Sequence, residues 1–338
     1  MAATIRLPVR LLLAGALALV LCVMGLFAWW THQPLHLKAE PVTFSVPPGA
    51  SLRAAAQAAV AGGVREPGAL LELFFRLAAR GRNIKPGDYA VTEGMTPGDL
   101  LDKLIRGERI ALTVTFIEGW NFKQARDALD KAQGLRHDTA QMNGAQIMAA
   151  LDRAGVAPEG RFFPDTYRYF RNASDLDILR QSLREMDRNL AAAWDARAPD
   201  LPLKSPDDAL TLASLIEKET GSAPDRAQVA GVFVNRLRAG MPLQTDPSVI
   251  YGMGERFTGS LRRADLQADT PWNTYLRRGL PPTPIALPGQ ASLLAAVQPA
   301  ATRALYFVAR GDGSSQFSQT LDEHNRAVNQ YQRGGPKR

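Results

Sequence analysis

The most apolar stretch of the chain lies near its N-terminus. Residues 11–30 read LLLAGALALVLCVMGLFAWW and contain no charged residue. At about 1.5 Å of rise per residue, a helix of this length would span roughly 30 Å, the thickness of the hydrocarbon core of a bilayer. Arg6 and Arg10 precede the stretch, which favours an N-terminus on the cytoplasmic side. The pattern predicts a transmembrane helix over 11–30 after a short cytoplasmic tail over 1–10.

A cleaved signal peptide would share this apolar pattern. The exit of the stretch reads Trp-Trp-Thr-His-Gln-Pro, however, and lacks the small-x-small site at which such a peptide is cut. Lipoprotein processing at Cys22 also fits poorly, because Val20 and Leu21 stand where small residues are expected. We therefore expect a retained single-pass anchor. If the protein is bacterial, the anchor would lie in the inner membrane and everything after residue 31 would face the periplasm.

Three segments after the anchor share one pattern, in which an extended apolar stretch is followed by a turn glycine and an amphipathic helix. The expected N-cap residues of these helices are Ser51, Thr96 and Asn121. Glycines stand near the three expected exits, at Gly63, Gly107 and Gly134. A further helical run is predicted over 67–81.

The first two of these units, over 40–108, resemble a small sugar-binding LysM-like module of βααβ order. Strand–turn–helix units occur in many folds, so the same residues would also serve as packing units that only space the remainder from the membrane. Between 109 and 338 the pattern predicts longer helices, over 178–194, 207–220 and 223–238. A hairpin is predicted over 305–319, followed by a last helix. The expected fold class is therefore α+β, with a larger catalytic domain after the module.

Composition excludes several classes of protein. Apolar residues make up 46% and charged residues 22%, which is typical of a globular chain and not of a disordered one. The net charge of +7 is compatible with nucleic acid, anionic lipid or an acidic polymer and selects none of them. One cysteine excludes an intramolecular disulfide framework, and the four histidines have no helical metal-pair spacing. We expect no metal and no cofactor.

The helix predicted over 207–220 carries two glutamates with different phases. Its apolar stripe is formed by Leu212, Leu215 and Ile216. At about 100° per residue, Glu219 falls inside this stripe, whereas Glu217 falls about 140° from Leu212 and is expected to face water. Burial raises the pKa of a carboxyl, which suits a general acid at neutral pH. A buried glutamate satisfied by a structural hydrogen bond would show the same pattern.

The chain after the next helix is short of charge but rich in hydrogen-bonding groups. Residues 241–252 read MPLQTDPSVIYG, and Trp272-Asn-Thr-Tyr275 and Gly279-Leu-Pro-Pro282 follow. Neutral polar and aromatic groups of this kind bind sugars. Taken alone, each of these segments would more often be a structural turn or loop than a functional site.

Together, these motifs resemble the endolytic murein transglycosylase (YceG-like) family. They are Leu212-Ala-Ser-Leu-Ile-Glu-Lys-Glu-Thr220, Val232-Phe-Val-Asn-Arg-Leu237, Leu243-Gln-Thr-Asp-Pro-Ser-Val-Ile-Tyr-Gly252, Phe163-Pro-Asp-Thr-Tyr167, Tyr275, Gly279-Leu-Pro-Pro282 and the closing Glu-His-Asn325. The resemblance is close over 159–167 and 211–325 and loose over 40–158, and 131–158 departs most. It implies Glu219 as the catalytic residue. The motif positions that it implies for substrate binding are Asn235, Gln244, Asp246 and Tyr251.

The resemblance also implies the reaction. The bond between N-acetylmuramic acid and N-acetylglucosamine would be cleaved without water inside peptidoglycan glycan strands, leaving 1,6-anhydro ends. Glu219 would donate a proton to the glycosidic oxygen and then accept the proton of the muramyl C6 hydroxyl, so one residue serves as acid and base. The implied role is control of strand length or termination of glycan elongation. Glycan strands, the membrane and murein synthases are the implied partners, and nucleic acid is not expected.

Two alternatives remain open from the residues. A hydrolytic muramidase would need a second carboxylate, for which Asp246 is the obvious candidate. A membrane-tethered peptidoglycan-binding scaffold would need no catalytic group at all.

Overall fold

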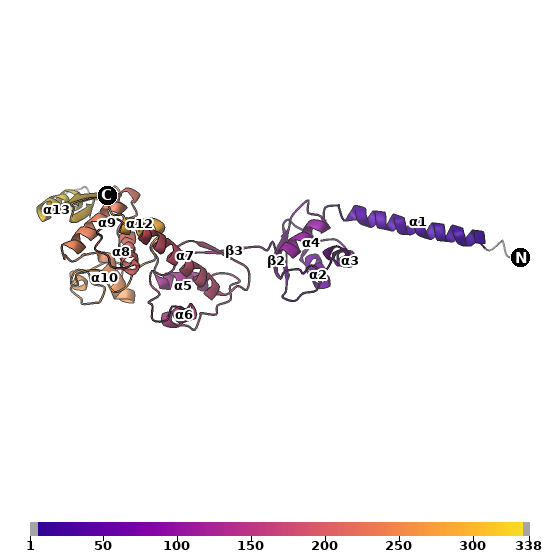
Figure 1. The fold of residues 1–338 in the computed structure, drawn as a ribbon, viewed down its shortest axis with the longest axis horizontal. Helices are drawn as coiled ribbons and strands as arrows, with labels where there is room; N and C mark the ends of the chain where they lie inside the picture. The colour runs from indigo at the N-terminus through magenta and orange to yellow at the C-terminus, as the bar shows by residue number, and fades with distance from the viewer. Residues whose placement is uncertain (1–5, 334–338) are drawn as a thin grey trace. The chain divides into compact units, whose positions relative to one another are not determined.

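The computed structural model describes residues 6–333 of the chain. The chain divides into two compact units, Met1–Leu112 and Thr113–Arg338, and Figure 1 labels many of their helices and strands. Helix α1 (Arg6–Trp30) begins the first unit, and its segment Leu11–Trp30 is long and apolar enough to cross a membrane. The predicted apolar helix is therefore present. Of the predicted tail over 1–10, residues 1–5 lie outside the described part of the chain.

The remainder of the first unit is a small α+β module. Its elements after α1 are β1 (Val42–Val46), α2 (Leu52–Gly62), α3 (Gly68–Ala79), β2 (Gly87–Val91) and α4 (Pro97–Arg106). The two strands pair antiparallel, with Val42 opposite Val91 and Val46 opposite Gly87. Strand β1 alternates buried and exposed residues, as expected when one face of a small sheet packs on helices. The order strand–helix–helix–strand agrees with the sequence pattern, while the LysM-like identity stays a prediction.

The three predicted N-caps are confirmed, as are the C-caps Gly63 and Gly107, whereas α5 has Lys131 and not Gly134 as its C-cap. The Ser51 hydroxyl accepts from the Ala54 backbone N–H at 3.2 Å. Thr96 and Asn121 each form a capping box, in which the cap side chain and the side chain three residues later satisfy each other's backbone N–H groups. Gly107 caps α4 at a φ of 74°, a left-handed conformation that glycine adopts without strain.

The second unit is mainly helical. Its elements in chain order are α5 (Phe122–Asp130), α6 (Gly144–Ala150), β4 (Thr166–Tyr169), α7 (Asp175–Asp195), α8 (Pro206–Glu219), α9 (Ala223–Arg238), α10 (Asp246–Met253), a 3₁₀ turn (Gly254–Arg256), α11 (Arg263–Leu266), α12 (Gln290–Val297), β5 (Tyr306–Ala309), β6 (Ser315–Ser318), α13 (Leu321–Val328) and a π turn (Asn329–Arg333). Strand β3 (Leu112–Thr115), at the boundary of the units, pairs with β4, and β5 pairs antiparallel with β6. The expected α+β class and the hairpin over 305–319 are confirmed.

Helix α8 lies at the centre of this unit. All eight residues from Ala209 to Ile216 are buried, and α8 packs against α7, α9, α10 and α12 (Figure 1). The sequence pattern predicted a single apolar stripe on this helix. The structure corrects this, because small residues and Thr211 and Ser214, whose hydroxyls bond to carbonyls of the same helix, allow close packing on every side. The end of α8 emerges from this core and carries the predicted acid.

Candidate active site

Glu219 is the last residue of α8 and is half-buried. The Thr245 hydroxyl donates a hydrogen bond to Oε1 of Glu219. Burial raises the pKa of Glu219 to about 7, and the negative charge of Asp246 adds to this; the Thr245 hydrogen bond and the positive charge of Arg236 oppose it. A helix C-terminus also carries partial negative charge, which disfavours an ionised carboxylate. The carboxyl is therefore populated in both protonation states near neutral pH.

Thr245 reaches Glu219 because side chains along 244–246 alternate between the solvent and the protein interior. Gln244 and Asp246 are exposed, and Thr245 between them is 1% exposed. Gln244 adopts a left-handed φ of 53°, and its N–H donates to the Thr274 carbonyl at 3.1 Å. The Thr245 N–H donates to the Thr274 hydroxyl oxygen at 3.0 Å. The side-chain amide of buried Asn273, next to Thr274, donates to the backbone carbonyls of Leu266 and Ala268.

Asp246 is paired with a tyrosine. The Tyr275 hydroxyl donates to Oδ1 of Asp246 at 2.5 Å. Burial raises the pKa of Tyr275, and Asp246 raises it further, so this phenol stays a neutral donor. The negative charge of Asp246 also raises the pKa of Glu219.

Arg236, which was not among the predicted site residues, holds the loop that carries these groups. Its guanidinium is buried and donates to the Leu305 carbonyl at 2.7 Å and to the Leu243 carbonyl at 2.9 Å. It also donates to Oε1 of Gln244 at 3.2 Å. Arg236 lies next to Asn235 in a helix whose apolar residues dominate the pattern, so nothing local revealed that its charge is buried. Only the fold brings residue 305 to it.

Asn235 and Gln244 are used differently from one another. Both N–H groups of the Asn235 amide donate to backbone carbonyls, of Thr302 at 2.9 Å and Ala304 at 3.0 Å. Asn235 therefore ties α9 to the segment before β5. Gln244 is exposed beside Asp246. The structure thus brings Glu219, Gln244 and Asp246 together, while the Asn235 amide is engaged away from the carboxyl.

Tyr251 belongs to a second buried carboxyl. Its hydroxyl donates to Oε2 of Glu159 at 3.1 Å, and its ring makes an edge contact with Trp272 at 5.4 Å between centroids. Oε1 of Glu159 accepts from the Phe122 N–H at 3.0 Å. Burial raises the pKa of Glu159 to about 7, although the hydrogen bonds from Phe122, Tyr251 and Gly160 oppose the shift. Glu159 is the first residue of the range 159–167 in which the family resemblance is close, but its burial depends on contacts with α5 and α10 and could not be predicted.

The expectation that Glu217 faces water is wrong in part. Glu217 is half-buried, and its Oε2 accepts from the Gly289 N–H at 3.0 Å. The segments over 117–120 and 287–289 bond to each other here, through Gly119 N–H to the Leu287 carbonyl at 2.9 Å. They cover the last turn of α8, which helical phase alone does not take into account.

No group of three or more His, Cys, Asp or Glu side chains able to hold a metal ion occurs within the described residues 6–333. The expectation of no cofactor stays a prediction. What the arrangement around Glu219 offers is a carboxyl poised to donate and accept a proton, and this carboxyl lies beside the exposed residues Gln244 and Asp246.

Comparisons with known proteins agree with this arrangement. A model of the YceG-like family matches residues 44–330. The chain is 32% identical to the endolytic murein transglycosylase of Bacillus subtilis over 269 residues, covering 72% of each chain. It is 27% identical to the endolytic murein transglycosylase of Streptococcus pneumoniae over 327 residues, covering 86% of this chain and 58% of that one.

A solved structure is also similar. The crystal structure of a YceG-like protein from Listeria monocytogenes matches with a TM-score of 0.55 and 28% sequence identity. The match covers 85% of this chain and 99% of that one. The likeness therefore extends through both units and is not confined to the motifs around Glu219.

Proposed function

The chain belongs to the YceG-like family, and from this premise we propose that it is an endolytic murein transglycosylase that cleaves peptidoglycan glycan strands. The names of the curated relatives support this activity. The observation that carries the proposal on this chain is the carboxyl of Glu219, whose pKa burial raises to about 7 beside the Thr245 hydroxyl.

In the proposed mechanism Glu219 performs both proton transfers. Protonated Glu219 donates to the glycosidic oxygen as the bond from C1 of N-acetylmuramic acid breaks. The resulting carboxylate then accepts the proton of the C6 hydroxyl, whose oxygen attacks C1 and closes the 1,6-anhydro ring. Because the nucleophile belongs to the sugar, no water and no second carboxylate are required, and Glu219 ends protonated for the next cycle.

Neighbouring groups favour this sequence. Thr245 holds Oε1 of Glu219, which leaves Oε2 for the substrate. The charge of Asp246 favours the protonated form that the first step needs, and Arg236 moderates this effect. We propose Asn235, Gln244, Asp246 and Tyr251 as substrate-binding positions. Exposed Gln244 and Asp246 would contact the sugar directly. Asn235 would act indirectly through the backbone carbonyls that it binds, and Tyr251 would act indirectly through Glu159.

We further propose the layout along the chain. Residues 11–30 would anchor the protein in the inner membrane with residues 1–10 in the cytoplasm, and the catalytic domain over 109–338 would act in the periplasm. The apolar helix supports this topology. The module over 40–108 would bind glycan as a LysM-like module does, and murein synthases would be partners in strand-length control or termination.

Digestion of purified sacculi by the full-length protein in detergent tests the proposal. Mass spectrometry of the released fragments should show 1,6-anhydro-muramyl ends. Reducing ends would instead identify a hydrolytic muramidase, in which Asp246 beside Glu219 supplies the second carboxylate. Intact sacculi that retain bound protein would identify a scaffold.

A further inference from the structure

The small module of the first unit is attached to the end of the apolar helix by side-chain contacts. The ring of Phe74 in α3 lies 6.5 Å from that of Phe27 and 6.3 Å from that of Trp30, between centroids. The indole N–H of Trp30 donates to Oε2 of Glu66 at 3.0 Å. These contacts fix α3 beside the last turn of α1.

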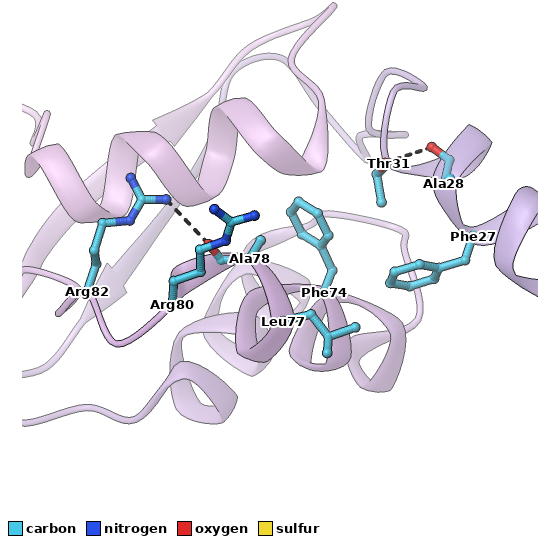
Figure 2. A pocket seen from close by; sticks show the side chains of 8 residues that line it. All are labelled: Phe27, Ala28, Thr31, Phe74, Leu77, Ala78, Arg80 and Arg82. Atoms are coloured by element: carbon cyan, nitrogen blue, oxygen red, sulfur yellow. Dashed lines mark hydrogen bonds between the residues drawn. The ribbon is translucent and has the colours of Figure 1, made fainter.

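This attachment sets the depth of α3 if α1 spans a bilayer. Phe27 lies inside the apolar segment Leu11–Trp30, about 4.5 Å before its end at about 1.5 Å of rise per residue. Leu77 of α3 lines the same pocket as Phe27 and Ala28 (Figure 2). The outward side of α3 therefore lies at the level where the span enters the headgroup region.

Helix α3 has a second apolar face that protein does not cover. Leu71 and Phe75 are fully buried in the module, as one apolar face of a helix requires. Leu73 and Leu77, however, are 48% and 62% exposed, and their spacing of four residues places them on one side of the helix. Together with Phe74 they make an outward apolar strip beside the span.

Arginines border this strip at the end of α3. Arg80 and Arg82 line the pocket of about 680 Å³ that contains Phe74 and Leu77 (Figure 2). The Arg82 guanidinium donates to carbonyls at the end of α3, of Ala79 at 3.2 Å and Ala78 at 3.4 Å, and its Nη1 lies 3.7 Å from Oδ1 of exposed Asp102. Arg80 is exposed, and within the described part of the chain it has no hydrogen bond or ion pair. A guanidinium so placed is suited to bind a phosphate.

We propose that this membrane face, defined as Leu73, Phe74, Leu77, Arg80 and Arg82, inserts into the outer surface of the bilayer that α1 spans. The leucines enter the boundary between headgroups and acyl chains, and the arginines bind the phosphates of anionic phospholipids. The inference rests on the anchoring proposed above. Continuity with the span selects the bilayer as the occupant, because Phe27 and Leu77 share one pocket. The catalytic unit would then be tethered to a module that lies on the membrane.

Depth-dependent fluorescence quenching tests the proposal on the full chain in vesicles. Cys22 is the one cysteine and lies near the middle of the span. A nitrobenzoxadiazole label on Cys22 therefore reports anchoring alone, and the same label in the Cys22→Ser, Leu77→Cys variant reports the membrane face. Two spin-labelled phosphatidylcholines serve as probes, one quenching near the headgroup and one near the chain end.

We expect the label at Cys22 to be quenched most by the deep probe and the label at position 77 most by the shallow one. A Cys22→Ser, Leu321→Cys variant is the matched control, since Leu321 is a comparably exposed leucine, at 54% against 62% for Leu77, in the other unit. It should be quenched by neither. A quenched Cys22 label with an unquenched label at 77 overturns the membrane face while anchoring stands. An unquenched Cys22 label refutes anchoring itself.

Two further outcomes would also overturn the proposal. Equal quenching at positions 77 and 321 would indicate adsorption without a specific face. A label at 77 that resists lipid quenching but cross-links to a second copy would identify a partner protein as the occupant. Nanodiscs that hold a single copy of the protein test for such a partner. Without a second copy to cover position 77, the label there would become accessible to the lipid quencher.

The arginines are tested through lipid charge. Replacing part of the phosphatidylcholine by phosphatidylglycerol should strengthen shallow quenching at position 77, since each arginine near an anionic surface contributes about fivefold to association. Arg80→Gln with Arg82→Gln should abolish the difference between the two lipids. The charge-matched control, Lys131→Gln with Lys204→Gln at exposed sites of the second unit, should retain it. Equal responses of the two double variants would contradict a role for the arginines.

Discussion

The hydroxyl of Thr245, at the start of α10, donates to the carboxyl of Glu219, at the end of α8. This one bond joins the loop that carries Gln244 and Asp246 to the proposed acid. It opposes the effect of burial, which is the main reason that the pKa of Glu219 rises to about 7. The pKa of the acid is therefore set by a balance that a single methyl-for-hydroxyl exchange can disturb.

Thr245→Val should move the pH profile of anhydro-muropeptide release upward. Removing the hydrogen bond raises the pKa of Glu219 further, so the limb of kcat/KM that reports loss of the protonated acid shifts to higher pH by about one unit. Thr245→Ser should restore the original limb. Thr211→Val in α8 is the control, because the Thr211 hydroxyl bonds to the Asp207 carbonyl of that helix and not to Glu219. An unshifted limb in Thr245→Val would show that the bond does not tune the acid.

Local features of the fold could be predicted from the sequence. The caps at Ser51, Thr96 and Asn121 follow from residues within one helical turn. The apolar helix follows from uninterrupted hydrophobicity. Glu219 could be selected because its motif and its position at the end of α8 are both local.

The surroundings of Glu219 could not be predicted in the same way. Arg236 bonds to residue 305, and Glu159 bonds to Tyr251, across separations that only the packed fold closes. The prediction that Glu217 faces water failed for the same reason, because the Gly289 N–H that it binds comes from a distant segment. Phase along a helix indicates which side a residue takes, but not what covers that side.

Glu159 should make the second unit less stable as pH rises. Its pKa is about 7 in the folded state against about 4.5 for an unperturbed glutamate, so the folded state holds a proton that the unfolded state releases. This stability is present below about pH 4.5 and is lost through about pH 7, by about 3 kcal/mol at 1.36 kcal/mol per unit. Glu219 adds a similar slope. Urea unfolding followed by tryptophan fluorescence measures it.

Glu159→Gln should remove about half of this decline in the free energy of unfolding, because the Glu219 contribution remains. Glu118→Gln, at an exposed carboxyl in the same unit, provides the control. A wild-type profile that is flat between pH 4.5 and 7 would refute both raised pKa values.

Gly160→Ala should destabilise the second unit by about 2–4 kcal/mol. Gly160 has a φ of 76°, and an added Cβ would lie 2.4 Å from Cβ of Pro284. Backbone strain and overpacking therefore act together beside Glu159. Gly155→Ala has a similar φ of 82° with nothing within 4 Å, so it should cost only the strain, about 1 kcal/mol. Equal losses in thermal unfolding would remove the packing argument.

The measurement that tests the central claim most directly is anhydro-muropeptide release from sacculi by Glu219→Gln and Glu217→Gln, with circular dichroism to verify folding. Glutamine keeps the size of the side chain but has no titratable proton, so Glu219→Gln should lose about 10²- to 10⁴-fold in turnover, the usual contribution of proton transfer. Glu217→Gln retains an oxygen for the Gly289 N–H, so it should cost about 1 kcal/mol of stability and leave turnover largely intact. An active Glu219→Gln beside an inactive, folded Glu217→Gln would contradict the assignment of the acid.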